Sequence, residues 1–170
     1  MIFGWLAVVA QTAPKSPPRF EDFPSPIDWK GPAAPLNLAA RADRSFRTRL
    51  LQATKEPPNF GGHYRVTTWG CGSECASGAI VDLATGQVIA PPLGKDTNAV
   101  MHFNVCSSAF EGFGVDTRTD SRLLILRCGL NFDVELNRNV PDVYYFLLES
   151  QGFRELLHLR GREARLVNSK

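Results

Sequence analysis

The feature that most limits the fold is the spacing of apolar residues after Asn59, which alternate with polar residues in short stretches separated by turn-forming residues. A period of two places apolar side chains on one face of a β-strand, whereas a helix has a period near 3.6. This pattern predicts strands at 64–69, 79–83, 87–90, 101–106, 113–115, 122–128, 143–148 and 153–159. The predicted fold is therefore mainly β (α+β), either an antiparallel meander or a small open barrel or sandwich.

The run Leu123-Leu124-Ile125-Leu126 is continuously apolar, which predicts a central strand covered on both faces. Thr85-Gly86 predicts a hairpin turn. Ser150-Gln151-Gly152 is expected to form a three-residue hairpin loop with Gly152 at a positive φ.

Only residues 38–55 have the pattern of an amphipathic helix. Ala42, Phe46 and Leu50 recur at every fourth position, which aligns them on one face. The arginines of this segment are expected to face away from the core: Arg41, Arg44, Arg47 and Arg49. The helix must end before Pro57, because a proline disfavours helical geometry in the residue that precedes it.

Four segments make up the predicted domain organisation. Residues 1–10 contain an uncharged apolar run that is too short to span a bilayer, which needs about 20 residues. We interpret it as a signal peptide, either complete or truncated, that is cleaved before Gln11. An N-terminal strand is the alternative. Residues 11–36 hold seven prolines and are expected to form an extended leader, tied down only in part. Residues 37–160 form the single β-rich domain, and 161–170 a basic tail.

Charge limits the classes of partner. The net charge of +2 is far below that of a protein that follows a phosphate backbone, so we expect no nucleic-acid partner. We also expect a monomer with no integral membrane span and no cofactor. The basic tail, with Arg160, Arg162, Arg165 and Lys170, is either a solvated end or a contact with anionic lipid or cell wall.

The four cysteines are an even set, which in an exported bacterial chain indicates two disulfides and a periplasmic or secreted location: Cys71, Cys75, Cys106 and Cys128. Three pairings are possible. We favour Cys71 with Cys75, inside one short loop, and Cys106 with Cys128, on neighbouring strands. A zinc site is the alternative, although the spacing departs from that of most structural zinc sites.

Three motifs give the chain a resemblance to a family. They are Asn-Phe-Gly-Gly-His-Tyr at 59–64, Trp-Gly-Cys-Gly-Ser-Glu-Cys at 69–75, and Gly-Ala-Ile-Val-Asp at 78–82 followed by Thr85-Gly86. They resemble a family of exported bacterial proteins that share an Asn-Phe-Ala-Gly-His-Tyr stretch and a Trp-Gly-Cys-Gly loop; Gly61 replaces the alanine here. The match covers about 30 residues closely and 40–159 in outline. The resemblance implies export and a shared fold, and it carries over no catalytic residue.

The loop at 69–75 is the first candidate binding site, because it combines an aromatic ring, an acid and glycines that let a ligand approach the backbone. Its candidate binding residues, with the nearby histidine, are Trp69, Gly70, Gly72, Glu74 and His63. The alternative is a purely structural loop pinned by a disulfide. A redox site is not indicated, since thioredoxin-like chemistry uses two intervening residues and this loop has three.

A hydrolase site is the second candidate, with Cys71 as nucleophile, His63 as base and Asp82 as the residue that orients it. The alternative is that His63 bonds to the sheet edge and Asp82 fixes the Thr85-Gly86 turn. His102 and His158 lack ligand spacing, so no metal site is expected from them. Four further residues have no calcium-loop spacing and are interpreted as turn residues: Asp116, Asp120, Asn131 and Asp133.

The leading hypothesis is therefore a non-enzymatic periplasmic protein, inhibitor-like or envelope-associated, that binds an envelope protein or ligand and is stabilised by disulfides. The alternative is a hydrolase that uses His63 with Cys71 or Asp82. A purely structural envelope component is the third possibility.

Overall fold

The computed structural model describes residues 16–38, 44–72, 75–89, 92–93, 101–104, 114–161 and 163–164. At residues 71, 72, 75, 76, 101–104 and 130–132 it describes the backbone alone. The predicted signal peptide, Cys106 and most of the basic tail lie outside the described residues. No helix in the described part of the chain is long and apolar enough to cross a membrane.

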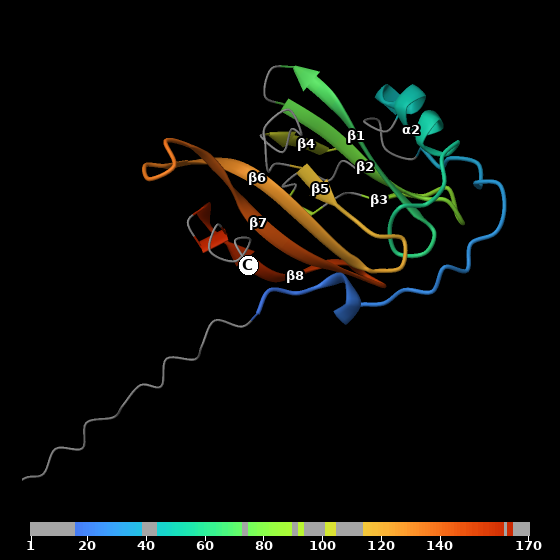
Figure 1. Cartoon of the computed structure of the whole chain (residues 1–170). Coiled ribbons are helices and arrows are strands. Elements are labelled where there is room, and N and C mark those ends of the chain that lie inside the picture. Colours follow the sequence, from blue (N-terminus) through green and yellow to red (C-terminus); the bar gives the residue numbers. More distant parts are fainter. Residues whose placement is uncertain are drawn as a thin grey trace, which may run out of the picture.

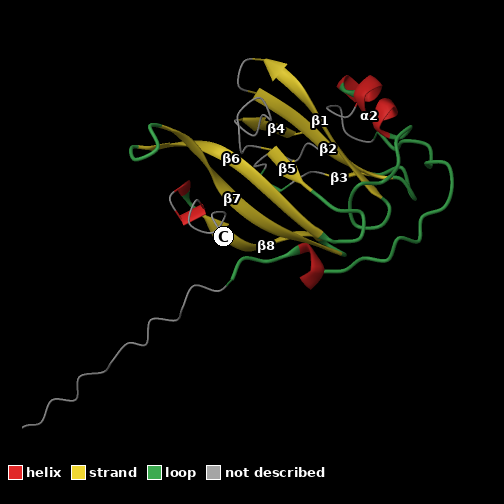
Figure 2. Cartoon of the chain, in the orientation of Figure 1, coloured by secondary structure: helices red, strands yellow, loops and turns green. Residues whose placement is uncertain are grey.

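The fold is mainly β, as predicted, with two antiparallel four-stranded sheets facing each other (Figures 1 and 2). In the first sheet β2 pairs with β1, β3 and β4; the second has the order β5-β6-β7-β8. The elements are η1 (Phe20–Asp22), α2 (Arg47–Ala53), β1 (Tyr64–Gly72), β2 (Cys75–Asp82), β3 (Val88–Ile89), β4 (Met101–Asn104), β5 (Gly114–Asp116), β6 (Leu123–Asp133), β7 (Arg138–Glu149) and β8 (Gly152–Leu159).

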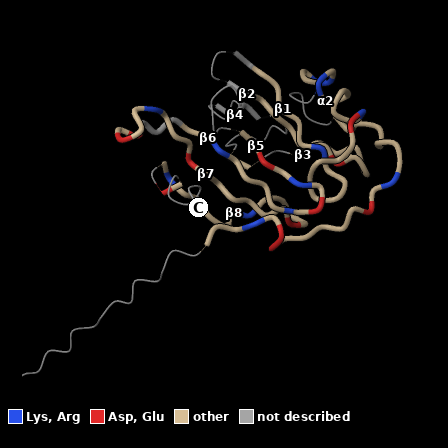
Figure 3. Tube along the Cα trace, viewed as in Figure 1, with Lys and Arg blue, Asp and Glu red and all other residues tan. Residues whose placement is uncertain are grey.

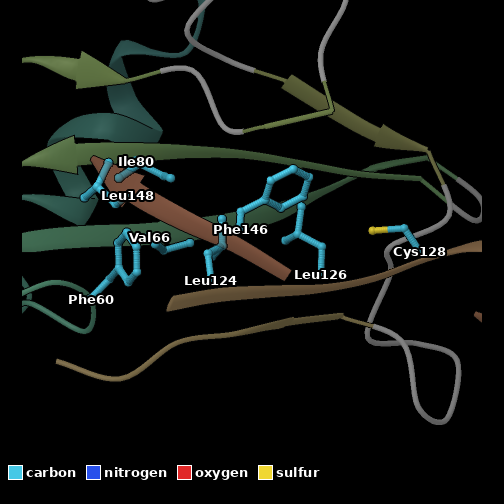
Figure 4. Packing of buried hydrophobic residues seen from close by; sticks show 8 residues of the cluster. All are labelled: Phe60, Val66, Ile80, Leu124, Leu126, Cys128, Phe146 and Leu148. Carbon is cyan, nitrogen blue, oxygen red and sulfur yellow. The ribbon is translucent and has the colours of Figure 1, made fainter. Parts of the chain in front are cut away.

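The main core lies between the two sheets (Figure 4). It consists of Phe60, Val66, Ile80, Leu124, Leu126, Cys128, Phe146 and Leu148. Neighbouring residues on the same strands point to the opposite faces, because side chains alternate along a strand. Leu123 and Ile125 therefore pack on the outer face of the second sheet, so β6 is covered on both faces as its apolar run predicts.

Helix α2 covers the outer face of the first sheet (Figure 1). It buries Leu50 and Ala53 and packs Phe46 against the same cluster, while Arg47 and Arg49 are exposed. The predicted apolar face is thus confirmed for α2; residues 44 and 45 before it are also helical, and residues 39–43 lie outside the described residues.

The Pro-rich leader, with Asn37 and Leu38 directly after it, is more firmly attached than predicted. Its backbone is hydrogen-bonded to the domain at several points: Ser25 N to Asp120 O (2.8 Å), Arg122 N to Phe23 O (2.9 Å), Ala34 N to Leu83 O (2.9 Å) and Asn37 N to Gly86 O (2.8 Å). Its apolar side chains also complete both outer layers, with Phe20 and Phe23 on the second sheet and Trp29, Ala33, Leu36 and Leu38 on the first. Fixed proline φ angles lower the entropy lost when such a segment is ordered.

Two glycines allow this close attachment. Gly62 has φ +87°, and a Cβ built there would lie 2.3 Å from the Pro26 carbonyl oxygen. At Gly86, with φ +76°, the corresponding distance to the Pro35 oxygen is 2.0 Å. The second glycine of the 59–64 motif, Gly62, therefore lets the leader dock closely.

Candidate functional site

His63 and Asp82 lie together at one end of the β1–β2 hairpin. Tyr64 and Asp82 are directly opposite each other in the ladder, which brings His63 Nε2 to 3.7 Å from Asp82 Oδ1. The His63 ring also contacts the Tyr64 ring at a centroid distance of 4.2 Å. Burial raises the pKa of Tyr64 above its usual value, and the Asp82 carboxylate adds to that rise.

The Asp82 carboxylate accepts hydrogen bonds from the turn that follows it. Oδ1 accepts hydrogen bonds from the backbone of Ala84 (2.9 Å) and Thr85 (3.3 Å), and Oδ2 accepts one from Thr85 Oγ1 (2.7 Å). The chain reverses here, with Gly86 N donating to Asp82 O at 2.8 Å. The interpretation of Asp82 as a turn-fixing residue is confirmed.

Cys71 lies at the opposite end of the same hairpin. Gly70 pairs with Ala76 there, while Tyr64 pairs with Asp82. A strand rises about 3.3 Å per residue, so roughly 20 Å of backbone separates Cys71 from Tyr64 and its neighbour His63. The structure therefore brings His63 to Asp82 but does not bring Cys71 to either.

The predicted binding residues do not form one site. Trp69 is half-buried on the cluster under α2, where its ring contacts Phe46 at 5.4 Å, so it packs the helix onto the sheet. Gly70 is exposed and Gly72 ends β1, so the glycines belong to a strand rather than a loop. Glu74 lies outside the described residues, and His63 is at the far end of β1.

Sequence reasoning missed the ribbon that β6 and β7 form beyond the sandwich. Cys128 pairs with Asp142 and Asn131 with Val140, so two residues of β6 oppose Pro141 alone. Gly129, with φ +93°, begins this β-bulge. A bulge bends and twists a ribbon, and here it directs residues 131–140 outwards (Figure 1).

The tip of this ribbon exposes two large apolar side chains. Val134 is 82% exposed and Leu136 is 39% exposed. The turn itself is well fixed, because Asp133 Oδ1 accepts hydrogen bonds from Glu135 N (2.9 Å) and Leu136 N (3.1 Å). Asn137 adopts a φ of +49°, which asparagine tolerates better than most residues. Among the described residues, the tip places two large exposed apolar side chains within three residues of each other on a backbone fixed by hydrogen bonds.

A second cluster that the sequence did not indicate joins β7, β8 and the C-terminal turn. His158 Nε2 lies 3.2 Å from Asp142 Oδ2, and Gly161 N donates to Asp142 Oδ1 at 2.8 Å. Tyr144 stacks on the His158 ring at 4.0 Å. Burial raises the pKa of Tyr144, and the Asp142 carboxylate adds to the rise. The Asp142 carboxylate thus contacts a half-buried histidine and links β7, β8 and the C-terminal turn.

Three further acidic residues make ion pairs or fix a turn. Asp116 pairs with Arg127, Asp120 pairs with Arg118, and Asp133 fixes the ribbon turn. Within the described residues, no group of three or more potential ligands is placed to hold a metal ion. Cys128 is buried in the main core, 5% exposed.

Comparisons with known protein-family models, curated proteins and solved structures found no match to this chain. The candidate function therefore depends on the geometry of the described residues.

Proposed function

We propose that this protein is an exported, non-enzymatic binding protein, inhibitor-like in its mode of action, whose β6–β7 tip enters a concave apolar site on a partner protein. The observation that carries the proposal is the exposure of Val134 and Leu136, 82% and 39%, on a tip that projects from the sandwich. A large apolar side chain in water loses about 1.5–3 kcal/mol relative to a buried one, and binding would recover part of this.

The order of the tip supports the same proposal. Asp133 fixes the backbone of Glu135 and Leu136 before any partner is present. Binding costs less when the binding element is already held in one conformation. The narrow, convex form of a two-stranded ribbon fits a cleft better than a flat surface (Figure 2).

Two disulfides are part of the proposal. β4 ends at Asn104, two residues before Cys106, and packs near β6, which carries the core residue Cys128. Two residues span up to about 7 Å, and we propose that Cys106 crosses this gap to pair with Cys128. Cys71 and Cys75 then form the second pair across the end of the β1–β2 hairpin, where Gly72 and Cys75 are opposite each other. A bridge that closes the 106–128 loop would stabilise the fold by about 3 kcal/mol in the chain-entropy model.

The mass of the intact protein, purified from the periplasm of the source bacterium, tests export and disulfides together. We expect a mass that lacks the first residues and rises by four hydrogens on reduction, with no cysteine alkylated before reduction. Cytosolic protein that retains Met1 and has four reactive thiols would contradict this part of the proposal.

Binding through the tip is tested by capture from the same periplasm. We expect the wild-type protein to retain a partner that the Val134→Asp, Leu136→Asp double variant does not retain. The matched control is Ile27→Asp, which alters another exposed apolar residue, 59% exposed, in the leader. With the partner purified, calorimetry should show at least tenfold weaker binding for the double variant and unchanged binding for the control. Equal affinity of the double variant and the wild type would exclude the tip as the binding element.

The hydrolase alternative makes a different prediction about Cys71. A thiolate nucleophile must be free and near its base, whereas the ladder register separates Cys71 from His63. Thiol titration of the native protein distinguishes the two functions, since a single reactive Cys71 would favour the hydrolase. A purely structural envelope component would show neither a reactive thiol nor a tip-dependent partner.

A further inference from the structure

Helix α2 and the residues around it concentrate positive charge on one side of the molecule. Residues 44–55 contain Arg44, Arg47, Arg49 and Lys55 and no acidic residue. This segment therefore carries a charge of +4 in a chain whose net charge is +2, so the rest of the chain sums to −2. Figure 3 shows the basic residues at α2. The first acid after the segment, Glu56, is already paired with Arg65.

An apolar side chain lies among these cations. Leu51 is 40% exposed, although Leu50 beside it is fully buried against the first sheet. Arg47 and Leu51 are four residues apart on α2, which places them on one face of the helix. Lys55 follows in the turn, two residues after the helix ends. We call these three residues, with Arg44 and Arg49, the α2 basic face. All five residues are exposed.

We propose that the α2 basic face binds anionic phospholipid surfaces. An amphipathic helix binds such a surface through cations that meet the headgroups and apolar side chains that enter the interface, and its affinity grows with both. Lys and Arg stems can lie along the apolar boundary with their charged ends outside it. Arg47, Leu51 and Lys55 together supply both kinds of group on the outermost layer of the fold. A duplex nucleic acid is a weaker match, because the rest of the chain carries a net charge of −2 and would not extend the basic surface along a phosphate backbone.

The arrangement leaves the β6–β7 tip accessible. In Figure 1 the tip and α2 lie on opposite sides of the molecule. A protein bound to a membrane through the α2 basic face would therefore direct Val134 away from the lipid. The inference does not depend on the tip having a partner.

Partition into vesicles tests this inference. The full chain is mixed with vesicles of phosphatidylcholine, with or without phosphatidylglycerol, and bound protein is measured by sedimentation. Residues 1–10 contain an apolar run that is present in every variant. The informative quantity is therefore the ratio of partition into anionic vesicles to partition into neutral ones. For the wild type we expect a ratio well above one that falls as salt is raised.

The variants distinguish the effect of charge at α2 from the effect of the net charge of the whole chain. The contribution of a cation near an anionic surface corresponds to about a fivefold change in partition, so Arg47→Gln with Lys55→Gln should lower the ratio about 25-fold. Arg19→Gln with Arg154→Gln makes the same change in net charge at exposed positions away from α2 and should leave the ratio unchanged. Leu51→Ser should lower partition into anionic vesicles without altering the salt dependence. Circular dichroism and thermal melting confirm that each variant is folded.

Three results would overturn the proposal. The first is a wild-type ratio near one, and the second is an equal loss in both double-glutamine variants. The third is binding to duplex DNA as tight as to the anionic vesicles at the same salt concentration, which would indicate a general affinity for polyanions.

Discussion

The Asp142 carboxylate holds His158 at 3.2 Å between Oδ2 and Nε2, and its other oxygen accepts a hydrogen bond from Gly161 N at 2.8 Å. This side chain therefore links β7, β8 and the turn after β8. Asp142→Ala should lower the free energy of unfolding by about 1–3 kcal/mol, since it removes the acceptor for a half-buried amide. Chemical denaturation measures this loss. The matched control, Asp28→Ala, alters an exposed carboxylate and should cost less than about 0.5 kcal/mol. Equal effects would show that Asp142 does not stabilise the fold.

Substitution by alanine should destabilise the protein at Gly62 and have little effect on its stability at Gly70. At Gly62 a Cβ would lie 2.3 Å from Pro26 O at a φ of +87°, whereas at Gly70 no atom lies within 4 Å of the new Cβ. We expect Gly62→Ala to cost about 2 kcal/mol or more, because both the backbone conformation and the contact with the leader are lost. Gly70→Ala should be nearly neutral. Thermal melting of the two variants checks this, and similar melting temperatures would contradict the role of Gly62 in docking the leader.

Arg118 should make the attachment of the leader depend on pH. Its guanidinium bonds to Asp120 and Glu21 and lies 5.6 Å from the centre of the Phe20 ring. A hydrogen bond with the backbone is the largest cause that lowers the pKa of Glu21, and the hydrogen bond from Arg118 is the second. The hydrogen bond from Arg118 also lowers the pKa of Asp120. A depressed pKa means that the stabilisation is present above the ordinary carboxyl pKa of about 4 and is lost as the pH falls through the lower folded value.

Hydrogen exchange of the Ser25 and Arg122 amides measures this effect, because both bond across the leader junction. In the wild type their protection should fall in acid, after correction for the intrinsic exchange rate. In Arg118→Met protection should be weaker at neutral pH and nearly independent of pH in the acid range. Identical profiles for the two proteins would argue against the ion pairs.

The three tyrosines of the chain should all ionise later in the folded protein than in urea. Burial raises the pKa of Tyr64, Tyr144 and Tyr145, partly offset for Tyr145 by Arg127. As the pH rises above the unfolded pKa of about 10, each tyrosine with a raised folded pKa lowers the stability of the protein, because the unfolded chain ionises more readily than the folded one. Phenolate absorbance, titrated with and without urea, measures the shift. A native titration curve that coincides with the curve in urea would refute it, and Tyr145→Phe should remove one of the three native transitions.

The strands were predictable where a single pattern of burial runs through them. Leu123 to Leu126 alternate between two buried faces, so the continuous apolar run correctly indicated a covered strand. The extension of β6 and β7 into the ribbon was not predicted, because Gly129 and Pro141 are typical of turns. In the structure they face each other at the bulge, where Pro141 is not needed as a donor in the ladder. Only the pairing of the two strands reveals this.

The candidate site was harder to predict than the strands. Asp82 was recognised as a turn residue because its partners follow within three residues in the sequence. Trp69 and His63 were predicted as binding residues of one site, yet the length of β1 separates them and α2 covers the face on which Trp69 packs. The cluster of Asp142 and His158 had no sequence signal, since the pairing of β7 with β8 creates it.

The route of the leader has a consequence for the order of folding events. Ser121 Oγ bonds to Phe20 O across a separation of 101 residues, so the docking surface for the N-terminal segment is synthesised long after that segment. Contacts of such high sequence separation are entropically costly to close early. The leader should therefore attach late, onto sheets that have already formed, and until then Phe20 and Phe23 remain in solvent while the outer face of β6 and β7 lacks part of its cover. Any factor that acts on the nascent chain has that interval in which to bind this face.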